Sequence, residues 1–340
     1  MKKNIVALAI ASAIAAPVAM ADAPTLFGQI NMNINNTTDA GTTVNSTASR
    51  IGVKGAEDLG NGLKAVYHLE WEVDVAGGTG AATSTTTLKD RNAFLGLAGG
   101  FGTVLMGRHD TPFKMSQPTD LFNDGAADLS PFSGKLGLLG KGGEIRAANV
   151  LAYVSPSFAG ITFVGAGVSP EAINGKPELT DAYSVAAMYG SSKKGLFLSA
   201  AYDSFNSDIN GAVQTANGIT VTNSSYTDVR VAGQYAAGGL IANVMYQSFD
   251  DGDSADAASE GSNIQAQLGY KMGKIMPKIK YSSVDYKTGK DGSAWAAGLN
   301  YSLAKKTTAY VYVSQLDENM KNNSLGKDKT STIVGLLHKF

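Results

Sequence analysis

Residues 63–72 read Leu63-Lys64-Ala65-Val66-Tyr67-His68-Leu69-Glu70-Trp71-Glu72, and they carry the clearest fold signal in the chain. All of its odd positions are apolar, whereas all but one of its even positions are charged or histidine. Side chains on a strand point alternately to the two faces of a sheet, so this stretch predicts a strand with one apolar and one charged face. The charged face would meet bulk water in a soluble sandwich and a wet lumen in a membrane barrel.

The same alternation recurs along the chain, for example in residues 50–54, 240–247 and 263–268. Between turn signals we predict sixteen strands, near residues 24–36, 47–56, 62–74, 88–98, 102–110, 146–156, 160–168, 180–190, 195–204, 225–236, 239–250, 261–271, 277–286, 293–303, 307–317 and 330–340. Short glycine-rich turns alternate with long polar connections. An even strand number and this alternation are typical of bacterial outer-membrane barrels.

A closed antiparallel barrel fits this pattern better than a soluble sandwich. Too many strands carry polar residues on the face that a sandwich would need for its apolar core. Hydrocarbon offers backbone groups no hydrogen-bond partner, so a sheet crosses a bilayer only when it has no open edge. Aromatic residues near the strand ends agree with interfacial girdles, although they also occur in soluble β proteins. The predicted fold class is therefore all-β, a transmembrane β-barrel.

Composition excludes several other classes of protein. The 340 residues include 28 Lys+Arg and 29 Asp+Glu, a formal net charge of −1, and no cysteine. This balance gives no general attraction to a nucleic-acid backbone, so nucleic acid is not an expected partner. The absence of cysteine removes disulfide scaffolds, thiolate metal sites and cysteine nucleophiles.

Residues 1–21 are predicted to be a cleaved signal peptide. Lys2 and Lys3 form a positive start, an apolar run follows, and Ala19-Met20-Ala21 has the pattern of a cleavage site. The run is short and interrupted by Pro17, which argues against a transmembrane anchor. Residues 22–340 would then form the barrel.

The strand near residues 88–98 breaks the alternation at one place. Arg91 is in phase with the apolar residues Ala93, Leu95 and Leu97. A bulge, a subunit contact or a different register would each account for this arginine.

Several motifs resemble those of the Gram-negative general porins. They are dense in the first half and at the C-terminus, and comprise Thr25–Asn31, Ser49–Ala65, Arg91–Leu97, Gly100–Val104 with Gly107-Arg108, Asn149–Gly160 with Ser155-Pro156, and Val334–Phe340. The resemblance implies a sixteen-stranded homotrimeric outer-membrane barrel that passes ions and small hydrophilic solutes by passive diffusion. It implies contact with outer-membrane lipid and lipopolysaccharide, and a terminal Phe340 that is read by the outer-membrane assembly machinery. It implies no catalytic residue and no cofactor.

The longest connection, residues 111–144, is too long for an ordinary loop. By resemblance it is the third external loop, which folds into the porin lumen and constricts it. Three prolines restrict it, and its apolar residues could pack against the inner wall. Asp120, Asp124 and Asp128 are spaced four apart, which would place them on one face if a short helix forms, as the resemblance implies.

Bases at lumen-facing positions would oppose these acids. They are Arg50, Lys54, Lys64 and His68, with Arg108 and Arg146 near the ends of the strands that flank the loop. Acids opposite bases would create a field across the constriction that disfavours apolar solutes. Alternatively, these charges are solvated or paired with one another.

The other groups of potentially functional residues predict no specific site. His68, His109 and His338 match no compact metal site, so we expect no metal ion there. The acidic run at residues 250–260 lacks the EF-hand pattern, although it could bind divalent ions between lipopolysaccharide phosphates. Phosphate-loop and nucleophile-elbow motifs are absent from the sequence.

Three functions are compatible with the sequence. A passive channel is the leading hypothesis. A solute-specific channel would need an aromatic stripe or a basic ladder inside; the sequence shows no aromatic ladder, although Tyr310 and Tyr312 could point inward. A barrel enzyme would need a catalytic pair at the rim, and His109 beside Asp110 is the adjacent candidate, without an evident serine nucleophile. The sequence leaves ion selectivity, conductance and natural solutes open.

Overall fold

The computed structural model describes residues 23–77, 88–128, 145–169, 179, 182–205, 225–250, 260–287, 289, 291–320 and 327–340. Its strands are β1 (Thr25–Thr37), β2 (Gly41–Ser46), β3 (Arg50–Gly60), β4 (Leu63–Val73), β5 (Leu88–Gly99), β6 (Gly102–Asp110), β7 (Arg146–Val154), β8 (Ile161–Val168), β9 (Ala182–Gly190), β10 (Gly195–Phe205), β11 (Tyr226–Ala237), β12 (Leu240–Asp250), β13 (Glu260–Tyr270), β14 (Ile275–Tyr286), β15 (Gly292–Ala304), β16 (Thr307–Leu316) and β17 (Lys329–Lys339). One short helix, α2 (Pro112–Met115), is present in this described part of the chain. The predicted signal peptide lies outside the described residues.

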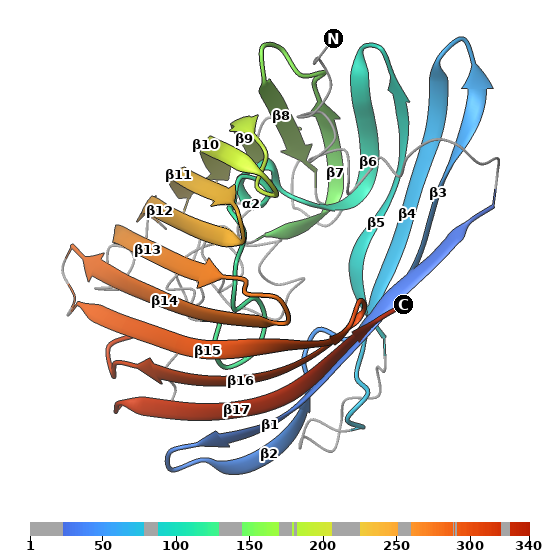
Figure 1. The fold of residues 1–340 in the computed structure, drawn as a ribbon. Coiled ribbons are helices and arrows are strands. Elements are labelled where there is room, and N and C mark those ends of the chain that lie inside the picture. The colour runs from blue at the N-terminus through green and yellow to red at the C-terminus, as the bar shows by residue number, and fades with distance from the viewer. Residues whose placement is uncertain are drawn as a thin grey trace.

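All strands belong to one antiparallel sheet that closes on itself (Figure 1). Sequential neighbours pair around the ring, and β1 completes it by pairing with β17 from Gln29↔Lys339 to Thr37↔Ser331. The strands β2 and β3 pair with successive parts of β1, separated by a break at Ala48, whose φ of 48° is left-handed. They therefore act as one barrel strand. The predicted sixteen-stranded antiparallel barrel is confirmed, with its second strand starting at Gly41 rather than near residue 47.

The burial of side chains is inverted relative to a soluble protein. On β13 the exposed residues include Ile264 and Leu268, at 44% and 48% exposure, whereas Gln265 and Gln267 are only 1% and 4% exposed. Polar side chains thus point inward and apolar side chains point outward. Such a surface is stable in hydrocarbon, because every strand in the ring has a partner on both sides.

A β-bulge explains the irregular position of Arg91. The β4–β5 register passes from Leu69↔Ala93 to Trp71↔Asp90, so β5 has one extra residue opposite Glu70. A bulge of this kind turns the side chain to the other face of the sheet. Arg91 therefore forms ion pairs with Glu70 and Glu72 of the neighbouring strand β4. Of the three alternatives that the sequence left open, the bulge is correct.

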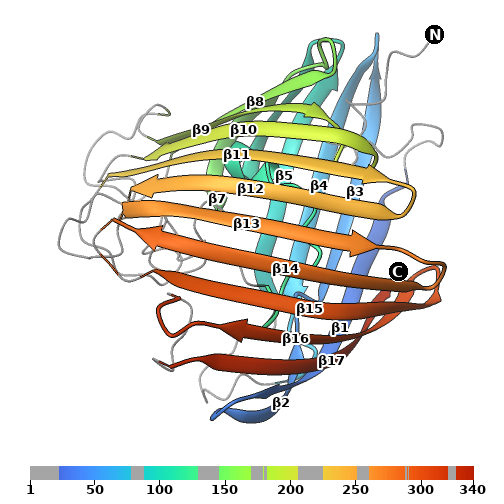
Figure 2. The same cartoon turned by 60° about the vertical axis from the view of Figure 1, so that its left-hand side comes forward.

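The two ends of the barrel differ in their connections (Figure 2). Short turns join β3–β4, β5–β6, β9–β10, β11–β12, β13–β14 and β15–β16 at one end, while the long connections, together with the three-residue β1–β2 turn, lie at the other end. In bacterial barrels the short turns face the periplasm. Among the described residues, no helix is long and apolar enough to cross a membrane.

Two glycines on the inner wall are covered by tyrosine rings. Tyr310 of β16 pairs with Gly335, and Tyr312 pairs with Gly298. A Cβ atom at either glycine would collide with the ring that covers it. The two rings stack on each other with centroids 4.5 Å apart. Glycine at these positions allows the aromatic pair to lie flat against the sheet.

We predict that Gly335→Val destabilises the barrel by about 1–3 kcal/mol, because the new side chain displaces Tyr310 from a packed position. Heat or denaturant unfolding of the purified barrel measures the change. The matched control is Gly165→Val, since a Cβ atom at Gly165 meets no atom within 4 Å. Equal unfolding midpoints for the two variants would contradict the prediction.

Candidate functional site

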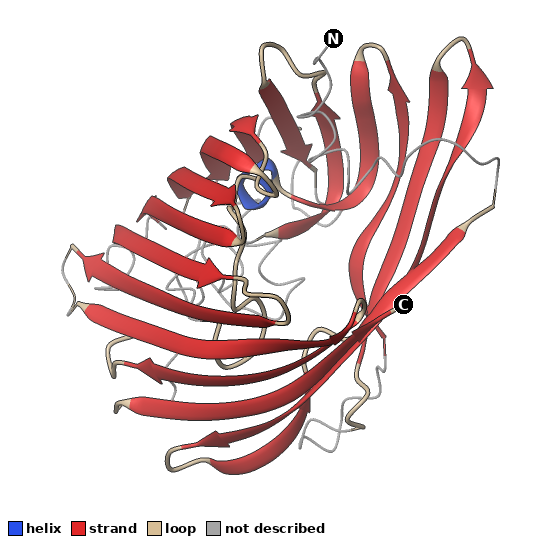
Figure 3. Ribbon diagram, in the orientation of Figure 1, coloured by secondary structure: helices blue, strands red, loops and turns tan. Residues whose placement is uncertain are grey.

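A continuous segment, residues 111–128, lies against the inner wall of the barrel (Figure 3). It starts with α2, where Thr111 caps the helix by accepting a hydrogen bond from the Lys114 N–H. Inner-face side chains from successive strands then bind its backbone. These contacts are Ser184 (β9) to Phe113 N, Ser199 (β10) to Ser116 O, Gln234 (β11) to Thr119 N, Asn243 (β12) to Thr119 O, Gln267 (β13) to Leu121 N, Lys278 (β14) to Leu121 O and Ser314 (β16) to Ala126 O. The segment therefore crosses the strands along the lumenal wall.

The backbone of this segment is held most tightly at two alternate residues. The Thr119 N–H donates to Gln234 over 2.8 Å, and its carbonyl accepts from Asn243 over 2.8 Å. The Leu121 N–H donates to Gln267 over 2.7 Å, and its carbonyl accepts from Lys278. Side chains thus replace the ladder that a neighbouring strand would supply, which satisfies the buried backbone groups.

One buried lysine binds two of the three predicted aspartates. The Lys280 ammonium lies 2.9 Å from Asp120 and 3.2 Å from Asp128, and its side chain is fully buried. The expectation that the three aspartates share a helix face is wrong, since residues 120–128 are not helical. Asp124 has a left-handed φ of 69°, which interrupts any helix. Its backbone N–H donates to the Asp128 carboxylate over 3.2 Å, while its own carboxylate does not pair with Lys280.

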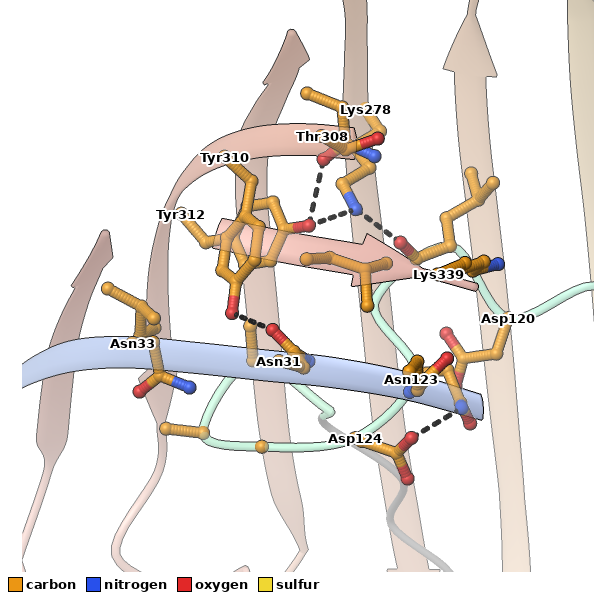
Figure 4. A pocket seen from close by; sticks show the side chains of 18 of the residues that line it. Asn31, Asn33, Asp120, Asn123, Asp124, Lys278, Thr308, Tyr310, Tyr312 and Lys339 are labelled. Carbon is orange, nitrogen blue, oxygen red and sulfur yellow. Dashed lines mark hydrogen bonds between the residues drawn. The ribbon is translucent and has the colours of Figure 1, made fainter. Parts of the chain in front are cut away.

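Beside this ion pair, a polar cavity of about 370 Å³ lies between the segment and β1, β3 and β14–β17 (Figure 4). Lys278 occupies its wall, 4.1 Å from the Tyr312 ring centroid and 4.4 Å from that of Phe122. It also donates to the Tyr312 hydroxyl over 2.9 Å. The hydroxyl of Tyr310 donates to Asn31 over 2.7 Å. The two tyrosines that the sequence singled out therefore do point inward.

Arg50 faces the same cavity from β3. Its guanidinium donates to Gln29 over 3.2 Å. It lies within electrostatic reach of Asp124 on the segment, as well as of Glu70, Arg91 and Arg146 on the wall. Of the predicted acids and bases, Arg50 and Asp124 are thus brought together at the cavity.

Arg146 and Arg108 lie where β6 and β7 meet the segment. Arg146 is 3.0 Å from Asp110, and its guanidinium donates to Asn92 over 2.7 Å. Asp110 also pairs with Lys114 of α2 over 3.2 Å. Arg108 is half-buried and interacts electrostatically with Arg146, Asp90 and Asp110. These bases hold the start of the segment rather than face its aspartates.

The remaining predicted bases, Lys54, Lys64 and His68, do not border the cavity that Arg50 faces. Lys54 is packed 5.1 Å from the Phe27 ring centroid, and His68 stacks on Phe94 at 5.5 Å and lies 3.7 Å from Glu70. Lys64 pairs in register with Asp58 beside the short β3–β4 turn. It is eight residues from the position opposite Arg50, which corresponds to about 27 Å along a strand. The structure thus separates Lys64 from Arg50.

The candidate catalytic pair does not have the geometry of a general base and its partner. His109 is 5% exposed, its Nδ1 atom lies 2.7 Å from the Asp110 carbonyl, and its ring packs edge-on against Phe94. The Asp110 carboxylate is bound by Lys114 and Arg146 instead. In the part of the chain that the structure describes, no group of three metal-ligating side chains is found either. The acidic residues 251–259 lie outside that part.

The sequence reasoning missed several residues of this site. Lys278 and Lys280 alternate with Ile279 and Tyr281 on β14, so the strand period already placed both lysines inward. Their partners on the segment are 152 or more residues away in the sequence. No local pattern identifies such partners.

The fold and this lumenal site define an outer-membrane channel barrel, and comparisons with known proteins agree. A family model described as Gram-negative porin matches residues 7–321. The major outer membrane protein P.IB of Neisseria meningitidis serogroup B is 28% identical, with full coverage of both chains. The P.IA protein of the same species is 30% identical, over 88% of this chain and 83% of its own length.

Solved porin structures share the fold. An anion-selective porin from Comamonas acidovorans aligns with a TM-score of 0.69 and 20% identity, covering 94% of this chain and 99% of that one. OmpF of Salmonella typhi in complex with daunomycin aligns with a TM-score of 0.72 and 17% identity, covering 93% and 97%. The chain belongs to the Gram-negative porin family, and it is an outer-membrane porin. Family and relatives point to a channel rather than an enzyme.

We predict that Lys280→Met loosens residues 119–128, because it leaves the Asp120 and Asp128 carboxylates without their ammonium partner. Removing one partner of a buried ion pair costs about 3–5 kcal/mol. Hydrogen exchange of the backbone amides of Leu121 and Asp124 should accelerate, and single-channel current noise should rise. Lys287→Met is the control, since its pair with Glu260 is exposed. Unchanged exchange in Lys280→Met would contradict this prediction.

Proposed function

We propose that this porin passes ions and small hydrophilic solutes by passive diffusion, and that residues 111–144 narrow its lumen. The observation that supports this most directly is the row of inner-wall side chains from β9 to β16 that binds the backbone of residues 113–126. A segment attached in this way reduces the free cross-section of the barrel. Residues 129–144 lie outside the described residues and belong to the proposal by continuity.

The charged side chains predicted to line the constriction would contribute unequally to the electric field that a passing ion meets. Most described lumenal acids have a basic partner: Glu70 and Glu72 bind Arg91, Asp110 binds Arg146, and Asp120 and Asp128 bind Lys280. Arg50 and Asp124 both face the cavity, and no ion pair of 4 Å or less joins them. Local unpaired charge decides ion selectivity in a pore. Arg50 is therefore the base that we assign to the field across the constriction, opposite Asp124.

A non-specific channel is favoured over a solute-specific one by the use of the inner aromatics. Tyr310 and Tyr312 stack on each other, cover Gly335 and Gly298, and bind Asn31 and Lys278. These contacts are made within the protein wall. An aromatic stripe for solutes would need rings whose faces remain open along the pore.

The proposal includes assembly. A related outer-membrane protein, OmpT of Vibrio cholerae, is described in a trimer form, and we propose a homotrimer here.

We also propose that residues 1–21 are removed on export and that Phe340 is recognised by the assembly machinery. Phe340 is paired with Gly28, whose carbonyl accepts from the Phe340 N–H over 3.1 Å. Its ring covers Gly28 on the outer surface.

We predict that Arg50→Glu shifts the reversal potential in a salt gradient toward cation selectivity, because a positive charge beside the cavity becomes negative. Planar-bilayer recordings measure the shift. Lys287→Glu makes the same change of charge at an exposed site beyond β14 and should leave the reversal potential nearly unchanged. An intact Arg50→Glu barrel with unaltered selectivity would show that Arg50 does not act on the pore.

We predict that proteoliposomes swell at rates that fall smoothly with sugar size and rise linearly with sugar concentration. Passive diffusion through a wet lumen has no saturable step. Heat-denatured protein provides the control for leakage. Saturation at millimolar concentration of one sugar would instead support a solute-specific channel.

A further inference from the structure

Five lysines gather at the periplasmic end of β13–β17. Lys271 and Lys274 lie in the β13–β14 turn, Lys305 and Lys306 form the β15–β16 turn, and Lys339 ends β17. All five are exposed, and none forms an ion pair among the described residues. We call these residues the lysine rim.

Backbone contacts show that the lysine rim is continuous around this part of the barrel. The Lys271 N–H donates to Gly239 of the preceding turn, and the Ser302 N–H at the end of β15 donates to the Lys274 carbonyl, both over 2.8 Å. The Lys339 N–H donates to the Lys306 carbonyl over 2.8 Å. The five positive charges therefore belong to neighbouring strand ends.

Negative charge is placed at the other end of the same strands. The described acidic residues after Leu240 all lie at or beyond the long-connection ends, and they are Asp250, Glu260, Asp285, Asp291, Asp317, Glu318 and Asp328. The turns 237–239, 271–274 and 305–306 contain no acid. Among side chains, the short turns of β12–β17 thus carry lysines and no acid, whereas the opposite end carries acids together with Lys287, Lys327 and Lys329.

Exposed aromatic residues mark the depth of the lysine rim in the membrane. Tyr270 ends β13, Tyr301 lies three residues before the end of β15, and Phe340 directly follows β17. Their side chains are 47%, 41% and 41% exposed. Aromatic girdles of outer-membrane barrels lie at the level of the lipid headgroups. Lys271 follows Tyr270 directly, and Lys339 precedes Phe340. The lysine rim therefore lies at the headgroup level of the periplasmic leaflet.

We propose that the lysine rim binds the phosphate headgroups of anionic phospholipids in the periplasmic leaflet. Each lysine near an anionic lipid surface strengthens the attraction, and the attraction is confined to about one Debye length. The flexible lysine side chains reach sideways to the headgroups while the aromatic residues hold the acyl boundary. The inference rests on the outer-membrane location and not on the proposed constriction.

A lipid fits this surface better than a soluble anionic partner, because the aromatic residues adjoin the lysines on the outer wall. A polymer below the membrane would need lysines but no aromatic belt beside them. Lys305, Lys306 and Lys339 also border the lumenal cavity. The test therefore uses Lys271 and Lys274, which do not border it.

The experiment uses the purified full barrel in a neutral detergent. Phosphatidylglycerol and phosphatidylcholine with identical acyl chains compete for the protein, and native mass spectrometry counts the retained lipids. The variants are Lys271→Gln with Lys274→Gln, the same pair changed to Arg, and the control pair Lys287→Gln with Lys327→Gln at the opposite rim. Resistance of each barrel to unfolding in detergent confirms folding.

We expect the wild-type protein, the arginine pair and the control pair to retain phosphatidylglycerol preferentially. The glutamine pair at the lysine rim should lose up to about fivefold of this preference for each charge removed at low ionic strength. An unchanged preference in that variant, or none in the wild type, would overturn the proposal.

Two further arms separate other anionic partners from a lipid. In the first arm, inorganic phosphate is added at roughly 10-fold excess over phosphatidylglycerol. Lipid retention should persist, because the acyl chains of the lipid also contact the aromatic residues beside the lysines. Complete displacement would assign the site to free phosphate. Sedimentation with isolated peptidoglycan that depends on Lys271 and Lys274, without any lipid preference, would assign it to that polymer and also overturn the proposal.

Discussion

Closure of the backbone hydrogen-bond network is the constraint on which the rest of this porin depends. A strand in hydrocarbon has no water to satisfy a free edge, so β1 must meet β17 and every strand must have two partners. Once the ring is closed, alternate side chains have only two destinations, lipid and lumen. The inversion seen on β13, with buried glutamines and exposed isoleucine and leucine, follows directly. Polar residues inside the barrel are therefore a consequence of the membrane outside it.

Closure also determines how residues 111–128 are held. A closed sheet has no free edge to which a further strand could add, so the wall can bind this segment only through side chains. Serine, glutamine, asparagine and lysine residues from β9 to β16 supply these hydrogen bonds. Most of the strands that the segment crosses contribute one such side chain. Lys280 adds an ion pair in a buried position. Such contacts satisfy the polar groups of the segment without requiring it to adopt strand or helix geometry.

The charges of the lumen fall into two groups with different roles. Arg91, Arg146 and Lys280 are matched by nearby carboxylates and stabilise a particular arrangement of wall and segment. Arg50 and Asp124 border the cavity and contribute to the field that a solute would meet. The net charge of the chain cannot tell paired charges from charges that face the cavity. The two ends of the barrel differ in the same way, since the five lysines of the lysine rim are exposed and form no ion pair among the described residues, whereas Lys287 and Lys327 at the long-connection rim bind Glu260 and Asp39.

The strand period, the sixteen-stranded membrane barrel and the inward direction of Arg50 could be predicted from the amino-acid sequence, because alternation is a local property of the chain. The same alternation allowed Tyr310 and Tyr312 to point inward, as they do. The sequence could not choose among the explanations for Arg91, since a bulge depends on the register between β4 and β5. It placed Lys64 with Arg50, although they lie at opposite ends of neighbouring strands, because parity specifies the face of a strand and not the height along it. The ion pairs of Lys280 with Asp120 and Asp128, and the hydrogen bond from Lys278 to the Leu121 carbonyl, are visible in the folded barrel but not in the sequence. Those partners meet through closure of the ring, and closure brings together residues that no local pattern connects.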